Sequence, residues 1–278
     1  MNDLAGRTFL VTGGNTGIGL AAARNFAGRG GHVYLACRSR AKGEAAVAAL
    51  AAETGNDQVG YLPLDLADLD SVRACAAEFL ARDEPLHVLV NNAGVAGRRG
   101  LTRDGFELMF GVNHVGHFAL TTALLDRLAD SAPARVVTVS SDAHYSAPGI
   151  DFGAVRQRTR HLTGMPEYAV SKLANVLFSQ ELGRRAAGRG VTTYALHPGV
   201  VASDIWRRIP WPARPLITRR MLTIEQGART PVFCATSPDV AGATGRFYID
   251  CHEAGPSRVA TPELAEALWE RSQTWAAV

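Results

Sequence analysis

The sequence predicts a three-layer α/β fold, in which a doubly wound parallel sheet of about seven strands carries helices on both faces. Three observations predict it. Short apolar segments of strand type alternate with longer helical patterns along the chain. A glycine-rich turn joins the first strand candidate to the first helix candidate. Polar motifs directly follow several strand candidates, and the carboxyl ends of parallel strands meet at one edge of a sheet.

The strand candidates are short runs rich in Val, Leu, Ile, Tyr and Phe. They cover about 7–12, 32–37, 58–62, 86–91, 134–140, 191–197 and 246–249. Helical patterns lie between them, at about 17–29, 40–53, 68–81, 104–130, 166–188, 223–236 and 262–275. Two stretches, at about 142–165 and 200–222, fit neither pattern. Long irregular loops in a compact domain are usually functional or mobile.

The bulk composition is that of a globular protein, with 47% hydrophobic and 20% charged residues. The net charge of +3 is too small to indicate nucleic-acid binding. No segment of about 18 apolar residues lacks charges, and no signal-peptide pattern opens the chain, so we expect no membrane span and no secretion. The four cysteines are scattered, which predicts no metal site and a reducing, cytoplasmic location.

The glycine-rich turn has the context of a dinucleotide-binding motif, since it follows a strand candidate and opens a helix candidate. Glycines let a pyrophosphate approach the backbone, and a helix N-terminus supplies N–H donors and a favourable dipole. The spacing is Gly-x-x-x-Gly-x-Gly, and a loop without a ligand is the alternative. The predicted nucleotide contacts of this turn are Gly13, Asn15, Thr16, Gly17, Ile18 and Gly19.

Tyr168 and Lys172 are four positions apart, so they fall on one face of the predicted helix. A free phenol has a pKa of about 10. An ammonium group beside it favours the phenolate and lowers that pKa, which would let Tyr168 exchange a proton near neutral pH. By itself such a pair is more often structural, so its interpretation as a catalytic pair depends on the other motifs.

Six motifs occur in an order that resembles the short-chain dehydrogenase/reductase family. They are 12–19, 91–94, Asn113, 139–141, Tyr168 with Lys172, and 197–199. Segments 36–38, 171–178, 190–199 and 247–251 are similar to the retinol-dehydrogenase-like branch. The resemblance implies a single NAD(P)-binding Rossmann domain over residues 1–278, with substrate loops at about 142–165 and 200–222.

The resemblance also implies an enzyme that interconverts a carbonyl and an alcohol by hydride transfer. The implied catalytic residues are Asn113, Ser141, Tyr168 and Lys172. Tyr168 would give or take the proton, Ser141 would donate to the carbonyl oxygen, and Lys172 would lower the tyrosine pKa and contact the ribose. Asn113 would help to hold a water in a proton path. Further cofactor contacts are implied at Asp65, Leu66, Asn92, Ala93, Gly94, Pro198, Gly199 and Val201.

Several of these residues have structural alternatives. Asp65 could be a turn or capping residue, and 91–94 is also a tight Asn-Gly-type turn. His114 and His117 lack the carboxylates or cysteines of a metal site and are interpreted as core or surface histidines. A nucleophilic role for Ser141 is disfavoured because no Gly-x-Ser-x-Gly motif surrounds it.

The end of the second strand candidate predicts the cofactor. Enzymes that use NAD usually carry an acid there, whereas arginine accommodates a 2′-phosphate. Here Cys37 stands at that position, Arg38 follows, and no acid occurs before Glu44. A guanidinium pairs well with a phosphate, so we predict NADP(H). The alternative is a solvated basic turn that opens the next helix.

The second irregular stretch suggests the substrate. Residues 203–218 contain several large apolar side chains, including Trp206 and Trp211, so we expect a lipophilic aldehyde or ketone. The arginines at 207–220 are interpreted as a solvated face, with an acidic substrate or an anionic membrane surface left open. A wide apolar band on helix 166–188 makes a homodimer or homotetramer plausible.

Two other functions remain open. One is a non-enzymatic NADP(H) sensor or scaffold on the same fold, although a sensor need not keep Asn113, Ser141, Tyr168 and Lys172 together. The other is an NADPH-dependent reductase of a carbon–carbon double bond, because such relatives share the Tyr-x-x-x-Lys pair. They tend to carry a cysteine where this chain has 198–200.

Overall fold

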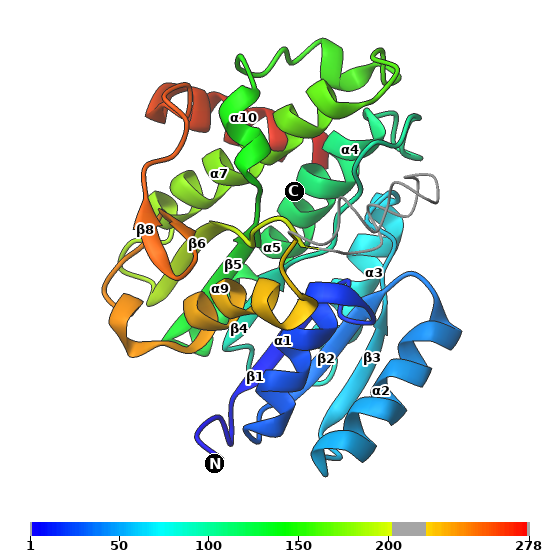
Figure 1. Cartoon of the computed structure of the whole chain (residues 1–278), viewed down its shortest axis with the longest axis vertical. Helices are drawn as coiled ribbons and strands as arrows, with labels where there is room; N and C mark the ends of the chain where they lie inside the picture. Colours follow the sequence, from blue (N-terminus) through cyan, green and yellow to red (C-terminus); the bar gives the residue numbers. More distant parts are fainter. Residues whose placement is uncertain (1, 202–220, 277–278) are drawn as a thin grey trace.

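The computed structural model describes residues 2–201 and 221–276, which form one eight-stranded sheet with helices on both faces (Figure 1). The strand order is β3-β2-β1-β4-β5-β6-β7-β8. The strands are β1 (Thr8–Thr12), β2 (His32–Cys37), β3 (Val59–Pro63), β4 (Val88–Asn91), β5 (Ala134–Val139), β6 (Val191–His197), β7 (Arg246–Ile249) and β8 (His252–Ala254). All seven predicted strands form close to their predicted bounds, and the doubly wound α/β prediction is confirmed.

Strands β1 to β7 pair in parallel, and only the last pairing in the described sheet, between β7 and β8, is antiparallel. β8 was not predicted because its three residues are largely exposed and carry no apolar pattern. Every residue of β1, β4 and β5 is buried. This explains why the central strands are continuous apolar runs, since helices cover both of their faces.

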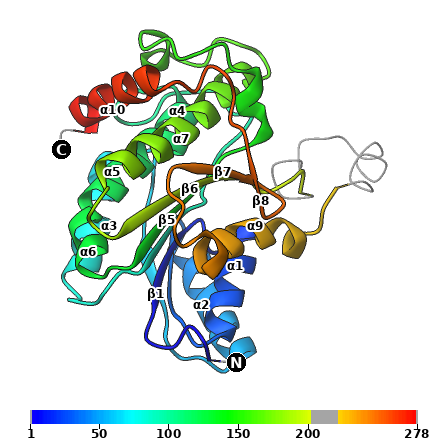
Figure 2. The same ribbon diagram turned by 90° about the vertical axis from the view of Figure 1, so that its left-hand side faces the viewer.

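The helices form two layers, which Figure 2 shows on opposite sides of the sheet. One layer is α1 (Gly17–Gly28), α2 (Arg40–Thr54) and α9 (Ile224–Thr236). The other layer is α3 (Leu69–Leu80), α5 (Gly116–Ala123), α6 (Leu125–Asp130), α7 (Met165–Arg185) and α10 (Pro262–Ala276). Each layer buries its own apolar cluster against the sheet.

The predicted helix at 104–130 is wrong in its start and in its continuity. It begins with α4 (Leu108–Phe110), passes through a π-helical turn at Gly111–Val115, and continues as α5 and α6. The start is set by Glu107, whose carboxylate accepts the backbone N–H groups of Met109 and Phe110, both at 2.9 Å. Single π-helical turns often occur at functional sites, and this one contains Asn113.

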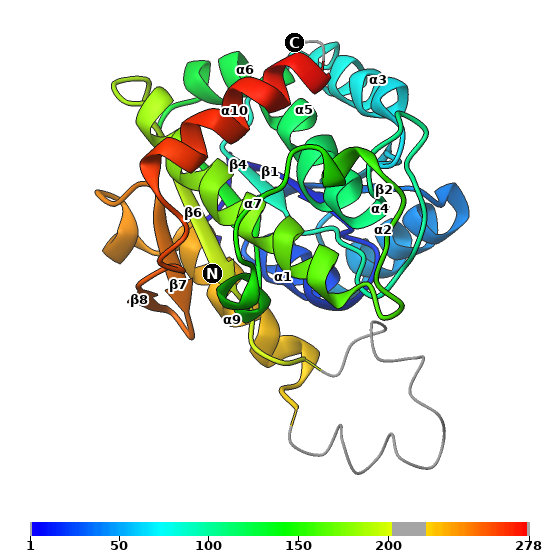
Figure 3. The ribbon, with the colours of Figure 1, turned by 90° about the horizontal axis from the view of Figure 1, so that it is seen from above.

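The wide apolar band on α7 packs within the same chain. Helix α10 lies across α7 and α5 (Figure 3). Phe178 of α7 stacks on Trp269 of α10, with ring centroids 6.0 Å apart, and the Arg185 guanidinium lies 5.0 Å from the Trp269 ring centroid. The band therefore no longer argues for a second copy of the chain, and self-association stays a prediction.

The irregular stretch after β5 contains two short 3₁₀ helices, η2 (Asp142–Ser146) and η3 (Ala154–Arg156). The second predicted substrate loop, at about 200–222, falls mostly outside the described residues. Its apolar side chains and its arginines are therefore not placed.

Candidate active site

A groove runs along the carboxyl edge of the sheet, where the strand order reverses between β1 and β4. It consists of three adjoining hollows of about 260, 320 and 800 Å³. Gly13 and Gly94 line both the first and the second hollow, and Ser140 and Tyr168 line both the second and the third. Most of the residues predicted to bind cofactor or to act in catalysis line this groove.

The glycine-rich turn is bound to the turn that follows β4. The Thr12 hydroxyl accepts the N–H groups of Asn92 and Ala93, at 2.9 and 3.0 Å, and the Asn92 amide donates to the Thr12 carbonyl at 2.8 Å. A Cβ atom at Gly19 would lie 2.6 Å from the carbonyl oxygen of Gly13, so no side chain fits there. The two turns form one closely packed wall of the second hollow.

The N-terminus of α1 opens onto this wall. Thr16 is the N-cap residue, but its side chain makes no capping hydrogen bond. The N–H groups of the first helical turn have no partner within the helix. Such a helix end suits an anionic group, because its N–H donors and its dipole both favour negative charge.

The first hollow carries two arginines and little negative charge. Arg38 and Arg98 line it, both are exposed, and neither makes an ion pair or hydrogen bond with another described residue. Cys37 ends β2 where an acid would favour NAD. Asp65 also lines the hollow, and its carboxylate accepts the Ala67 N–H at 3.0 Å. Asp65 therefore acts as a turn residue, and its contact with a cofactor stays a prediction.

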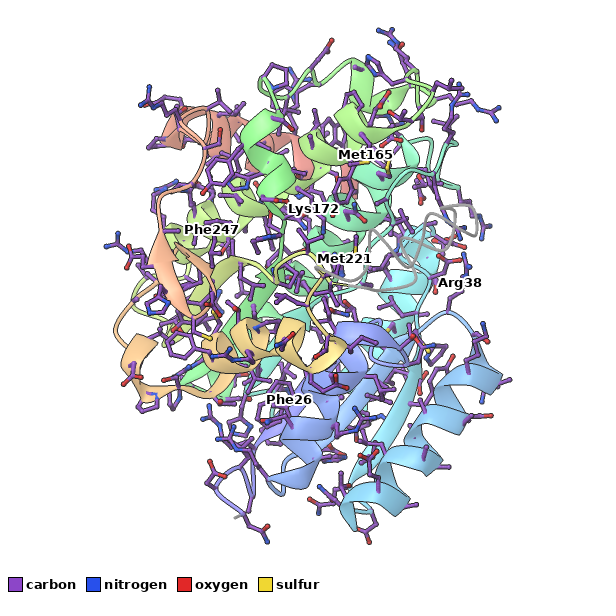
Figure 4. All side chains as sticks on the ribbon, in the orientation of Figure 1. Phe26, Arg38, Met165, Lys172, Met221 and Phe247 are labelled. Atoms are coloured by element: carbon purple, nitrogen blue, oxygen red, sulfur yellow. The ribbon has the colours of Figure 1, made fainter. Side chains whose placement is uncertain are left out.

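Lys172 is buried between α7 and the end of β5, near the middle of the molecule (Figure 4). Its ammonium donates to the Val139 carbonyl at 2.9 Å and lies 5.6 Å from the ring centroid of Tyr168. Burial lowers the pKa of Lys172 to about 8, because charge is disfavoured away from water. The Ser140 hydroxyl donates to the Lys172 carbonyl at 2.7 Å and so ties β5 to α7.

Asn113 and Lys172 meet at Gly94. A Cβ atom on Gly94 would lie 3.3 Å from the Asn113 amide oxygen and 3.6 Å from the Lys172 ammonium. The Asn113 amide oxygen accepts the Val95 N–H at 2.8 Å, and its nitrogen donates to the Val95 carbonyl and the Ser171 hydroxyl. Protein groups thus hold this side chain in place.

Ser141 follows β5 and lines the third hollow. Its hydroxyl donates to the carboxylate of Asp142 at 2.8 Å and accepts the N–H of Ala143 at 3.2 Å. Its carbonyl accepts a hydrogen bond from His144 Nδ1 at 2.6 Å. The Nε2 atom of the same imidazole accepts the N–H of Ser257 at 3.1 Å, which fixes the tautomer of His144.

The fold and this groove agree with the comparisons to known proteins. The family model described as short chain dehydrogenase matches residues 7–211. The chain belongs to the short-chain dehydrogenase family. Its relatives include human retinol dehydrogenase 12, 45% identical over 97% of this chain and 86% of the relative. Another is dehydrogenase/reductase SDR family member 13 of Bos taurus, 44% identical over 98% and 73%. These relatives place this short-chain dehydrogenase in the retinol-dehydrogenase-like branch.

Solved structures support the same assignment. An uncharacterised protein from Mycobacterium paratuberculosis has a TM-score of 0.79 and 36% identity, over 99% of this chain and 95% of that protein. The RhlG/NADP active-site complex of Pseudomonas aeruginosa has a TM-score of 0.71 and 27% identity, over 88% and 94%. The described residues of this short-chain dehydrogenase contain no helix long and apolar enough to span a membrane.

One sequence prediction about this short-chain dehydrogenase is wrong. The pKa of Tyr168 was expected to be lowered by Lys172, yet burial raises it to about 12. The hydrogen bond to Ser141 acts in the opposite direction but is the smaller effect, and the charge of Asp142 adds to the rise. Desolvation depends on the surrounding fold, which a four-residue spacing does not report.

His114 and His117 are core residues, as one of the two interpretations had it. Both are fully buried, and burial lowers their pKa values to about 3 and about 4. His117 Nδ1 contacts the carbonyl of Asn113 at 3.0 Å, and its Nε2 contacts the Thr12 hydroxyl at 2.8 Å. His117 therefore connects the glycine-rich turn to the π-helical turn. No cluster of three metal-ligating residues occurs in the part of the chain that the structure describes.

Sequence reasoning did not single out several residues of the groove. They are Arg98 in the first hollow and Asp142, Leu162, Met165, His197 and Val200 in the third. Four of them fall within the predicted substrate loops at about 142–165 and 200–222, and Arg98 and His197 lie outside both loops. Leu162 and Met165 are 83% and 47% exposed, so their place on the cleft wall leaves apolar surface in contact with water. Figure 4 labels Met165 at the start of α7 and Lys172 further along the same helix. Only the motif 197–199 pointed to His197, and it gave no role for that side chain.

A further hollow of about 550 Å³ lies between α1 and α9. It is lined by Arg24, Arg229 and Phe233 among others, and it contains none of the predicted site residues. It shares no lining residue with the two hollows that Tyr168 lines, so we do not assign the chemistry to it.

Proposed function

We propose that this short-chain dehydrogenase is an NADP(H)-dependent oxidoreductase that interconverts a ketone or aldehyde and its alcohol. The observation that carries the proposal is the position of Tyr168, which lines both the nucleotide-facing second hollow and the large third hollow. A proton donor at this junction can reach a carbonyl in the third hollow while a cofactor occupies the first and second.

The residues present fit a dinucleotide. The turn at 13–19 and the uncapped start of α1 would hold the pyrophosphate, Asp65 and Leu66 would adjoin the adenine, and 92–94 would adjoin the nicotinamide half. Pro198 also lines the second hollow, whereas Gly199 and Val201 line the third. When bound, NADP(H) would supply or receive the hydride.

The protein groups supply the proton and the orientation. Tyr168, whose pKa is about 12, is protonated at neutral pH and can donate to the carbonyl oxygen in reduction. Ser141 can stabilise charge on that oxygen through its hydroxyl. The buried ammonium of Lys172 favours the phenolate left after proton transfer, and Asn113 keeps the wall around Gly94 fixed. We infer that these four residues act as a unit.

The preference for NADP(H) rests on the first hollow. A 2′-phosphate carries close to two negative charges, and the hollow is lined by the guanidinium groups of Arg38 and Arg98, which make no ion pair with any described residue. The RhlG complex of Pseudomonas aeruginosa, which has the same fold, contains NADP. Cys37 offers no carboxylate to the ribose hydroxyls, which disfavours NAD.

Arg38→Asp is expected to weaken NADPH binding by roughly 10- to 100-fold, because one charge-assisted contact is lost and a repulsive charge is added. NADH binding should stay the same or improve. The two affinities are measured by fluorescence titration of each reduced cofactor. Arg189→Asp, a charge reversal just before β6, is the control and should change neither. An unchanged NADPH/NADH ratio in Arg38→Asp would refute the assignment.

The third hollow supports a lipophilic substrate. Its lining contains the apolar side chains of Leu162, Met165, Val200 and Ile18, together with the polar side chains of Ser141 and Tyr168. Apolar pockets with a few placed polar groups suit apolar ligands. Following NADPH absorbance with a panel of apolar aldehydes, ketones and conjugated alkenes tests the function. Consumption with carbonyl compounds is expected, and tight NADPH binding without any consumption would contradict it.

We also propose that residues 1–278 work as one domain in a reducing compartment such as the cytoplasm. All four cysteines are free, and three of them are buried. The partner that this function requires is a small-molecule substrate, and a homodimer or homotetramer stays a prediction.

A further inference from the structure

Asp142 places a carboxylate at the wall of the third hollow, which Ser141 and Tyr168 also line. It follows Ser141 directly and opens the short helix η2. Its side chain is 57% exposed, and the hollow that it lines also contains the apolar side chains of Leu162 and Met165. Neither the sequence motifs nor the proposed function uses this residue.

The hydroxyl group of Ser141 uses its only proton in a hydrogen bond to this carboxylate. An ionised carboxylate can only accept, so in the 2.8 Å contact between Ser141 Oγ and Asp142 Oδ1 the serine is the donor. One lone pair of Ser141 accepts the N–H of Ala143. A hydroxyl has one proton and two lone pairs. Ser141 must therefore release Asp142 before it can donate to a substrate oxygen or to the Tyr168 oxygen, the contact that lowers the pKa of Tyr168.

The end of β6 holds Asp142 in this position. The Asp142 N–H donates to His197 Nδ1 at 3.2 Å, so the neutral imidazole carries its proton on Nε2. That Nε2 lies 3.8 Å from Asp142 Oδ2. His197 is 8% exposed and belongs to a strand, and this makes it a rigid support.

We propose that Asp142 is a positioning residue of the active site: it holds the Ser141 hydroxyl proton away from the substrate oxygen, and it places a negative charge on the wall of the hollow that Tyr168 also lines. The proposal rests on the proposed function for its kinetic part. In alcohol oxidation Tyr168 must lose its proton first, and a negative charge beside the phenol disfavours that loss.

Other titratable groups surround Asp142 and Tyr168. Lys172 lies on the same helix as Tyr168 and favours the phenolate. The charge of Asp142 raises the pKa values of His197 and His144, although burial lowers both overall. It also adds to the raised pKa of Tyr145, which burial dominates. Asp142 is the one carboxylate among these charged neighbours, so replacing it isolates the effect.

Asp142→Asn keeps an oxygen that can accept from Ser141, so the turn should persist while the charge is lost. The pH profile of kcat/KM for alcohol oxidation should shift to lower pH by about half to one pH unit, since a half-exposed charge acts weakly. Asp57→Asn removes an exposed charge far along the chain and is the matched control. Coinciding profiles for wild type, Asp142→Asn and Asp57→Asn would overturn the proposal.

A second readout needs no turnover. The protein has six tyrosines, so the tyrosinate absorbance of Tyr168 is obtained by subtracting the titration of Tyr168→Phe, measured with NADP⁺ added. The same subtraction is made in the Asp142→Asn background. A lower midpoint for Tyr168 in that background supports the proposal even if every substrate fails, and an equal midpoint refutes it.

Discussion

Tyr168→Phe is expected to abolish turnover and to leave cofactor binding intact. The phenylalanine ring fills the same space at the junction of the second and third hollows but has no proton to give. General acid–base catalysis contributes about 10²- to 10⁴-fold to a rate, so kcat should fall by at least that range. NADPH affinity, measured by fluorescence titration, should change little because the glycine-rich turn and the first hollow are untouched.

The matched control for this substitution is Tyr248→Phe. Tyr248 is buried in β7, where it packs against Tyr194 and Phe233, away from the groove. Tyr248→Phe removes a tyrosine hydroxyl from a buried position away from the groove, so this variant should keep normal turnover. Near-normal turnover in Tyr168→Phe, with carbonyl substrates that the wild type reduces, would remove the acid–base role from this tyrosine.

Lys172→Met is expected to stop turnover and, at the same time, to stabilise the protein at neutral pH. The pKa of Lys172 falls from 10.5 to about 8, which corresponds to about 3 kcal/mol of unfolding free energy lost by burying the charged form. Met is a flexible chain that fills the space of the stem. The Val139 carbonyl keeps a donor, because the Asn175 amide also contacts it at 3.1 Å.

The pH dependence of this gain has a definite sign. Below about pH 8 the lysine is charged in both the folded and the unfolded states, so the wild type bears the full cost of burial. Between about pH 8 and 10.5 the folded state binds fewer protons, and the stability of the wild type rises with pH. The advantage of Lys172→Met should therefore be largest at pH 7 and should fall to about 1 kcal/mol at pH 10.

Urea unfolding at both pH values measures this advantage. Lys42→Met provides the comparison, because Lys42 is exposed on α2 and its loss should change stability little at either pH. A Lys172→Met protein less stable than the wild type at pH 7 would show that Lys172 is held by favourable interactions rather than at a cost. Such an outcome would place the residue in a structural role.

The fold was predictable because it depends on local patterns. Each strand is a short apolar run, and each helix carries a periodic face. The glycine-rich turn and the pair on α7 were equally visible, since a turn needs residues without side chains and a helix fixes spacing. The exception is the helix around Asn113, where the cap formed by Glu107 and the π-helical turn depend on packing against residues distant in sequence.

The chemistry inside the groove was harder to predict. Asp142 and His144 of η2 lie near His197 only because η2 begins beside the end of β6, and no short motif contains all three. Arg98 reaches the first hollow from a loop with no regular pattern. The predicted direction of the Tyr168 pKa change was wrong for a related reason, because the burial of this side chain depends on the whole fold. Similarly, the apolar band on α7 indicated a partner that proved to be α10.

The most direct measurement follows the transfer of deuterium from labelled NADPH to a conjugated enal. The NADPH carries deuterium at the transferable position of nicotinamide C4. The enal offers a carbonyl and a carbon–carbon double bond in one molecule. Mass spectrometry and NMR locate the label in the product. Deuterium on the carbinol carbon with wild type, and none with Tyr168→Phe, is the predicted result. Deuterium on the former alkene carbon, or NADPH bound without any transfer to the enal or to saturated aldehydes and ketones, would contradict carbonyl reduction at this site.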